Sequence, residues 1–477
     1  MSLGSTRTGA TLPRLNTALS LALAALLVTA PIPAGSNRPV FWVLWGAVVA
    51  VMGSIYAVAM IRSKSLPRFT LEQIPVLRTL SAIIVIYLAA QLVPFAPLLQ
   101  AIGLPVSALF GSIASPAISV APGMTALVLL QWATYMLFFY LALQVAVNRE
   151  RAHWLLHAIF YIISAHAAYA LLALAQLGDP MLIFEKWAYA GAATGTFVNK
   201  NSFATFVAFG LVTGLCLMLR DAEARLRGRD NDPRVGRVTN WSAILINGVC
   251  LLTLATALIA SQSKAGVFAA AIGCLAALLV FAARRREGNR RGAILIALLI
   301  LVAGIGVVAL YGGGLLERVG SLDSSVDIRA SLYQQTIGMI LERPWIGYGG
   351  GTFEAVFPYF HRLPVSPDLV WDKAHSTYLA LWAEMGLIAG TIPLVIMAII
   401  AWSLLKTSLE RSRDWTLPLA GFAVIVVAAV HSIVDFSLEI EANVLIFLAI
   451  VALGLAGAFA PVKSAAQLRR EPRMGGW

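Results

Sequence analysis

The chain has 477 residues, of which 59% are hydrophobic and only 12% are charged. An average soluble domain carries about 25% charged residues, so this composition excludes a soluble enzyme, a disordered chain and a fibre. A net charge of +12 would suggest nucleic-acid binding in a soluble protein. In a membrane protein its meaning depends on where the Lys and Arg residues lie along the chain.

Twelve apolar segments follow one another along the chain, each long enough to cross about 30 Å of hydrocarbon. Because a helix satisfies its own backbone hydrogen bonds in lipid, and because these segments do not alternate as barrel strands do, we expect helices. The sequence thus predicts an all-α integral membrane protein, with one polytopic domain over residues 1–477. The segments are 17–34, 40–61, 75–95, 122–147, 153–177, 202–220, 241–260, 265–283, 292–311, 376–405, 415–434 and 441–461.

The positions of Lys and Arg indicate how the segments are oriented. With the N-terminus in the cytoplasm, every inner connection is basic, whereas two outer connections contain no Lys or Arg. This positive-inside pattern predicts that both termini are cytoplasmic. It also explains the basic excess by topology, so we expect no nucleic-acid partner. The first apolar stretch lacks a convincing cleavage site, and we expect a retained span rather than a signal peptide.

The three cysteines lie inside apolar segments, at Cys216, Cys250 and Cys274. Their spacing fits neither a disulfide framework nor a metal site. The motifs H-E-x-x-H and G-x-x-x-x-G-K-[ST] are absent from the sequence. We therefore expect neither a metal nor a cofactor.

The outer connection between the ninth and tenth segments, about 312–375, is too long to be a simple connector. Apolar residues recur within it at helical spacing, and acidic, basic and proline residues mark a helix start and stop. We predict an amphipathic helix on or in the outer leaflet, followed by a flexible turn at GYGGGTF, 347–353. The apolar positions are Leu332, Tyr333, Ile337, Ile340 and Leu341.

Polar residues that a membrane span does not explain gather near the outer ends of the segments, and they are the candidates for a site. His375 opens the tenth segment, where the positive end of the helix disfavours the imidazolium. A neutral imidazole can accept a proton, which makes His375 a candidate general base. The alternative is a boundary histidine that contacts lipid headgroups.

Two outward-facing cations oppose the positive-inside trend. Arg329 in the loop helix can hold two phosphate oxygens at once, and Lys264 at the start of the eighth segment adds a point charge. The alternative for Arg329 is a surface salt bridge with Asp323 or Asp327. The alternative for Lys264 is a snorkelling residue at the interface.

Five further residues are candidates for a supporting role. Asn199 and Asn201 could bind sugar hydroxyls or phosphate, although turn and cap chemistry is the simpler explanation for at least one of them. Glu384 could pair with a cation of a neighbouring helix, either structurally or in catalysis. His431 and Asp435 are four residues apart, hence on one face if the helix continues. They could orient another group or form only a local hydrogen bond.

Three stretches of the sequence resemble the signature of the O-antigen ligase and polymerase superfamily: RPWIGYGGGTFEAVFP, AHSTYLALWAEMGLIAG and HSIVDFSLEIEANVLIFLAIVALGLA. The resemblance is strong over 320–455 and weaker at GTFVNKNSFATF and ASQSKAGVF. It implies a glycosyltransferase of the bacterial inner membrane, with a periplasmic active site and an undecaprenyl-diphosphate-linked glycan as donor. It also implies that Arg329 and His375 are the essential pair, and that Lys264 stands where members usually carry arginine.

The resemblance leaves two acceptors open. A ligase moves the glycan to a lipid A–core sugar, whereas a polymerase moves it to another lipid-linked repeat unit. We prefer the ligase, acting without a metal and with inversion at the anomeric carbon. A third hypothesis is a transporter of lipid-linked glycan, which predicts ionisable groups at the membrane midplane. No Asp or Glu lies at the centre of a predicted span, which favours an enzyme.

Overall fold

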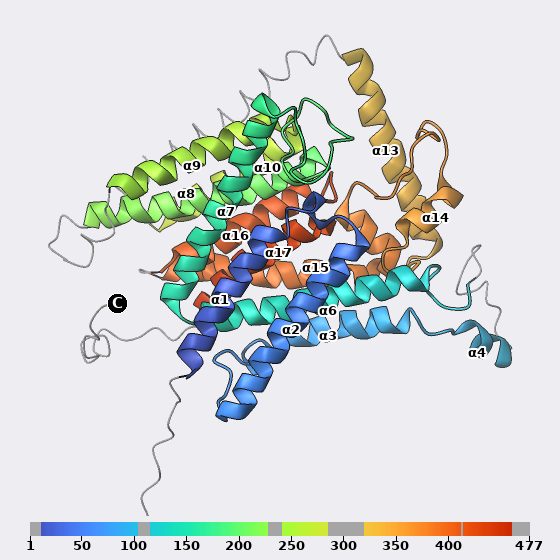
Figure 1. Ribbon diagram of the computed structural model, residues 1–477. Coiled ribbons are helices and arrows are strands. Elements are labelled where there is room, and N and C mark those ends of the chain that lie inside the picture. The colour runs from blue at the N-terminus through green and yellow to red at the C-terminus, as the bar shows by residue number, and fades with distance from the viewer. Residues whose placement is uncertain (1–10, 104–114, 228–240, 285–318, 412–413, 460–477) are drawn as a thin grey trace, which may run out of the picture.

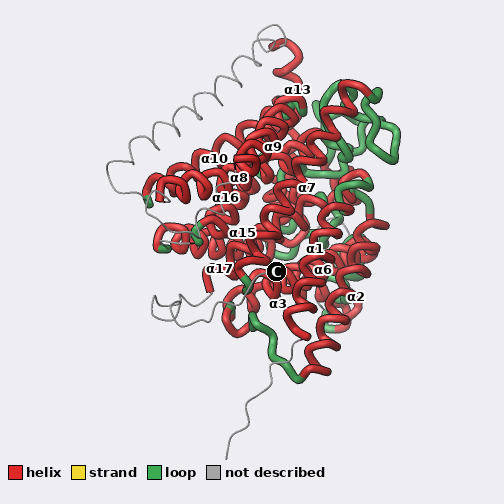
Figure 2. The backbone as a smooth tube through the Cα atoms, turned by 60° about the vertical axis from the view of Figure 1, so that its left-hand side comes forward, coloured by secondary structure: helices red, strands yellow, loops and turns green. Residues whose placement is uncertain are grey.

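The computed structural model describes residues 11–103, 115–227, 241–284, 319–411 and 414–459. These residues form helices and connections without a β-strand (Figures 1 and 2). The prediction of an all-α protein is therefore confirmed. Both ends of the chain and the ninth predicted segment, 292–311, lie outside the described residues.

The other predicted segments coincide with helices, and eight of the helices in the described part of the chain are long and apolar enough to cross a membrane. Three shorter apolar stretches are Arg14–Thr29 within α1, and the helices α3 and α16. The count of twelve spans therefore stays a prediction. The helices are α1 (Thr11–Thr29), α2 (Pro39–Ser63), α3 (Pro75–Ala90), α6 (Pro122–Ala146), α7 (Arg149–Gln176), α8 (Lys200–Arg227), α9 (Trp241–Ala260), α10 (Lys264–Ala283), α15 (Thr377–Glu410), α16 (Thr416–His431) and α17 (Glu441–Phe459).

Helices α8 and α17 form the centre of the bundle. Within their apolar windows 78% of residues are buried, against 22% in α2 and α9, which lie at the periphery. Helix α17 packs on α6 and α16, and α8 packs on α10 and α16. Small residues permit this close packing, because a Cβ atom on Gly273 of α10 would lie 2.3 Å from Cγ2 of Val427 on α16.

The long connection predicted between the ninth and tenth segments contains two helices, α13 (Val319–Glu342) and α14 (Phe353–Phe360). The helix predicted there is thus confirmed, and it packs on α15. Its buried side chains include Leu332, Met339 and Ile340, whereas Ile337 and Leu341 are exposed. The amphipathic pattern is therefore correct for part of the predicted face, and the position of α13 at the outer leaflet stays a prediction.

The glycine-rich segment after α13 turns, but it is not the flexible connection that the sequence predicted. Residues 347–350 are buried, and two of their amides hydrogen-bond to α15. The Tyr348 nitrogen donates to the Ala383 oxygen at 3.0 Å, and the Gly349 nitrogen donates to the Glu384 oxygen at 2.9 Å. Buried backbone groups of this kind need partners, and these bonds fix the segment in place.

A break in α15 makes this pairing possible. Gly386 has a φ of 74° and a ψ of 167°, which interrupts the helix and frees the preceding carbonyls. A Cβ atom on Gly386 would lie 2.3 Å from the Trp345 oxygen, so only glycine fits there. Irregular backbone is tolerated within a membrane bundle where protein covers it.

Candidate functional site

Three long helices begin at the same end of the bundle. Helix α8 begins at Lys200, α10 at Lys264, and α15 at Thr377, two residues after His375. The starts of α8 and α10 are joined by a 2.8 Å hydrogen bond from Ser263 to Asn201, and all three helices pack against α16. Helix N-termini carry partial positive charge and unpaired N–H groups, so this end of the bundle favours an anion.

His375 lies just before α15, in a backbone conformation with a φ of 52°. Its ring packs edge-on between two aromatic rings, with centroids 5.9 Å from Trp371 and 5.1 Å from Phe436. Its main-chain oxygen accepts a 2.9 Å hydrogen bond from the Tyr333 hydroxyl of α13. Its Nδ1 atom is buried and has no hydrogen-bond partner among the described residues.

The surroundings of His375 favour its neutral form. Burial lowers the pKa of the imidazole, and the positive charge of Arg329 lowers it further. The carboxylates of Asp435 and Asp372 act in the opposite direction, and burial remains the largest effect. Since the ordinary pKa of histidine is about 6.5, the ring is neutral near pH 7 and can accept a proton.

Arg329 is exposed on α13, one helical turn before Tyr333. It forms no ion pair with a carboxylate among the described side chains, and Asp323 and Asp327 lie outside that set. Its charge lowers the pKa values of both His375 and Asp435. The structure therefore brings Arg329 to the place where His375 lies, although 46 positions separate them in the sequence.

Lys264 is the first residue of α10 and is exposed. The preceding residue, Ser263, caps the helix by accepting a 3.2 Å hydrogen bond from the Gly266 nitrogen. No described carboxylate pairs with Lys264. Its exposed position leaves its ammonium group available to an anion.

Lys200 is a third cation that the sequence reasoning missed. The charges of Arg329 and Lys264 both act on Lys200, so it lies within electrostatic reach of each of them. Its Nζ atom lies 5.7 Å from the centroid of the Tyr189 ring. Lys200 in GTFVNKNSFATF carries the same signal as Lys264, because it too is a cation just before an apolar segment.

The two asparagines have different roles. The Asn199 side-chain oxygen accepts from the nitrogens of Asn201 and Ser202, at 2.7 and 3.4 Å, so Asn199 caps α8. The Asn201 side chain instead bridges two elements: it donates to Asp435 at 3.2 Å and accepts from the Ser263 hydroxyl at 2.8 Å. Cap chemistry thus accounts for Asn199, while Asn201 ties α8 to α10 and to Asp435.

His431 and Asp435 are close together, but not for the reason that their spacing suggested. Helix α16 ends at His431, so Asp435 lies in the following turn rather than on the same helix. The two side chains are buried, with His431 Nδ1 3.8 Å from Asp435 Oδ2. Asp435 also accepts a short hydrogen bond from Ser437. Burial raises the pKa of Asp435, and that hydrogen bond opposes the rise.

Glu384 does not lie with the cations, and no described cation forms an ion pair with it. Its carboxylate accepts hydrogen bonds from the nitrogens of Gly351, at 2.8 Å, and Phe353, at 3.4 Å. The sequence suggested a partner on a neighbouring helix, but the broken α15 turns this side chain toward the glycine-rich segment. Among the described residues, the ion pair nearest to Glu384 in the sequence joins Lys373 to Glu439, with Nζ and Oε2 2.9 Å apart.

Comparison with known families identifies the central part of the chain. The family model of O-antigen ligases matches residues 249–394. This stretch is similar to an O-antigen ligase domain. It contains Lys264, Arg329, His375 and Glu384, and it confirms the resemblance to the superfamily. No curated protein matches the chain.

The O-antigen ligase match and the apolar helices agree with each other. Together they indicate a multi-pass membrane protein, and the family indicates a glycosyl-transferring enzyme with lipid-linked glycan substrates. Lys200, Asn201, His431 and Asp435 lie outside the matched residues. They join the O-antigen ligase domain through the contacts of α8 and α16 with α10.

Proposed function

We propose that this protein transfers a glycan from undecaprenyl diphosphate to a lipid A–core sugar at the periplasmic face of the bacterial inner membrane. One observation carries the proposal: Lys200 and Lys264 open two helices that the 2.8 Å hydrogen bond between Ser263 and Asn201 joins, and the charge of Arg329 on α13 reaches both Lys200 and the neutral imidazole of His375. A diphosphate is the ligand that such a cluster suits, because each cation can contact phosphate oxygens.

The cations act on the leaving group. The bond between the anomeric carbon and the diphosphate oxygen breaks, and negative charge grows on that oxygen. Arg329 and Lys264, with Lys200 beside them, stabilise this charge, and preorganised cations of this kind are a large source of catalysis. The leaving group departs as prenyl diphosphate, so the reaction needs no metal in this scheme.

His375 acts on the acceptor. It accepts the proton of the attacking sugar hydroxyl as that oxygen bonds to the anomeric carbon. A single displacement inverts this carbon. The resulting imidazolium is stabilised by Asp435, whose charge raises the pKa of His375. Asn201 and Ser437 hold the Asp435 carboxylate through hydrogen bonds, which makes Asp435 a positioning residue.

Reconstitution of the purified protein with a lipid-linked donor and an acceptor tests the proposal. We expect His375→Ala to remain in the membrane and to lose transfer by about 10²–10⁴-fold, the usual contribution of a general base. The matched control is His361→Ala, since His361 lies in the same outer connection and hydrogen-bonds to the Val365 oxygen. Unchanged transfer by His375→Ala contradicts the role given to His375.

A knockout separates ligase from polymerase. Loss of a ligase leaves long lipid-linked chains unattached, whereas loss of a polymerase leaves single repeat units on the acceptor. Vesicles containing the purified protein separate both from a transporter. Translocation of lipid-linked sugar without a new glycosidic bond would contradict the transferase proposal and support a transporter.

A further inference from the structure

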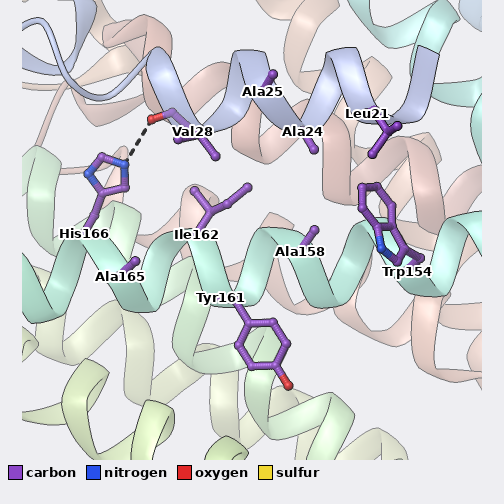
Figure 3. Close-up of a pocket in the computed structure, with 10 residues that line it drawn as sticks. All are labelled: Leu21, Ala24, Ala25, Val28, Trp154, Ala158, Tyr161, Ile162, Ala165 and His166. Atoms are coloured by element: carbon purple, nitrogen blue, oxygen red, sulfur yellow. Dashed lines mark hydrogen bonds between the residues drawn. The ribbon is translucent and has the colours of Figure 1, made fainter. Parts of the chain in front are cut away.

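An apolar groove lies between α1 and α7, away from the polar site. Figure 3 shows the two helices side by side, with small and branched side chains between them. The groove is open and has a volume of about 460 Å³. Its walls include Ala24 and Ala25 on α1 and Ala158, Ile162 and Ala165 on α7.

The residues that line the groove follow one another along the two helices. Trp154 lies at one end beside Leu21, and His166 lies at the other end beside Val28 (Figure 3). These positions on α7 are twelve residues apart, which corresponds to about 18 Å along a helix axis. That length exceeds half of the hydrocarbon thickness of about 30 Å.

The His166 end of the groove meets the segment that leads into the cation cluster. His166 Nε2 is 3.2 Å from the Val28 oxygen, and Nδ1 is 3.4 Å from the Thr196 hydroxyl. Thr196 lies four residues before Lys200, so the chain between them spans at most about 14 Å. Gly195 packs on the same part of α7, since a Cβ atom there would lie 3.0 Å from Cβ of Ala170.

We infer that this groove holds the isoprenoid tail of the lipid diphosphate donor. The inference rests on the proposed function, and it adds a place for the part of the donor that does not react. The cations bind the diphosphate at one end, and the apolar walls of α1 and α7 bind the chain that extends from it. Positive charge near one end of the groove and apolar walls along the rest of it match an isoprenoid diphosphate better than a zwitterionic phospholipid.

The first test measures binding alone. A polyprenyl diphosphate with a photoreactive diazirine in its tail is crosslinked to the full-length protein in nanodiscs, and the labelled peptides are mapped. We expect label on α1 and α7 that excess unlabelled polyprenyl diphosphate removes and excess phosphatidylethanolamine does not. Label that both compounds remove equally, or label confined to other helices, overturns the inference.

The second test fills the groove. Ala158→Phe on one wall, or Ala25→Phe on the other if the first does not fold, should raise the KM for a long-chain donor by about fivefold, the effect of losing the burial of one or two methylene groups. A geranyl-linked donor is too short to reach Ala158 and should show no such rise. Ala57→Phe, at an exposed position of α2, is the matched control.

The two tests distinguish the inference from the proposed function. If the wild-type protein transfers no glycan, the proposed function fails, while the crosslink still reports whether the groove holds the tail. If transfer is normal and the groove-filling variants match the Ala57→Phe control with the long-chain donor, the groove inference fails and the proposed function stands.

Discussion

The Tyr333 hydroxyl donates a 2.9 Å hydrogen bond to the main-chain oxygen of His375. Tyr333 follows Arg329 by one turn of α13, so the helix that carries Arg329 also holds the backbone of His375. That backbone has a φ of 52°, which few residues other than glycine adopt. The outer connection therefore contributes to the position of both proposed catalytic residues.

Loss of this hydrogen bond should lower the rate without unfolding the protein. We expect Tyr333→Phe to reduce kcat by about two- to tenfold, because a hydrogen bond contributes about 0.5–1.5 kcal/mol net. The measurement is glycan transfer at saturating donor, alongside the amount of protein in the membrane. Tyr359→Phe removes an exposed hydroxyl from the same outer connection, and equal rates for the two variants contradict the role of Tyr333.

The pH profile should report the charges around His375. The neutral ring accepts the proton, so kcat/KM falls as the pH drops through the pKa of His375. Arg329 lowers this pKa, and its removal in Arg329→Gln should move the acidic limb to higher pH. Asp435 raises the pKa of His375, so Asp435→Asn should move the acidic limb to lower pH.

The opposite signs of these two shifts make the pH experiment specific. Asp368→Asn removes an exposed carboxylate from the same outer connection and should leave the acidic limb where it is. Shifts in the same direction for Arg329→Gln and Asp435→Asn, or no shift in either, would mean that a group other than His375 controls the profile.

Loss of the Lys200 charge should weaken donor binding. We expect Lys200→Ala to raise the KM for the donor by about ten- to hundredfold, because a hydrogen bond to a charged group is worth about 1.5–3 kcal/mol. Lys200→Arg should retain most of the affinity, since the charge is kept. Lys406→Ala removes an exposed lysine from the last turns of α15. A KM for Lys200→Ala that equals the control value removes Lys200 from the site.

The sequence predicted the helices because hydropathy is a local property, and each apolar segment in the described part of the chain became a helix. The site depends on contacts between distant segments, such as Asn201 with Asp435, 234 positions apart. Spacing put Asp435 on one face with His431 only if the helix continued, and α16 ends at His431. The partners of Glu384 were equally hidden, because the positive φ of Gly386 that turns the chain there cannot be read from hydropathy.

The break in α15 should tolerate no side chain. Gly386 has a φ of 74°, and a Cβ atom there would lie 2.3 Å from the Trp345 oxygen. We expect Gly386→Ala to destabilise the protein by at least about 1–3 kcal/mol, the cost of a strained backbone position, and to lower transfer because the hydrogen bonds that the Glu384 carbonyl accepts from Gly349 and Gln91 are disturbed. The measurement is the midpoint of thermal aggregation of the purified protein, followed by size-exclusion chromatography.

The control is Gly248→Ala in α9, where the new methyl group meets nothing within 4 Å. It should leave the midpoint unchanged or raise it, since alanine favours a helix by about 1 kcal/mol. Equal midpoints for the two variants would show that the chain at Gly386 can relax around a methyl group.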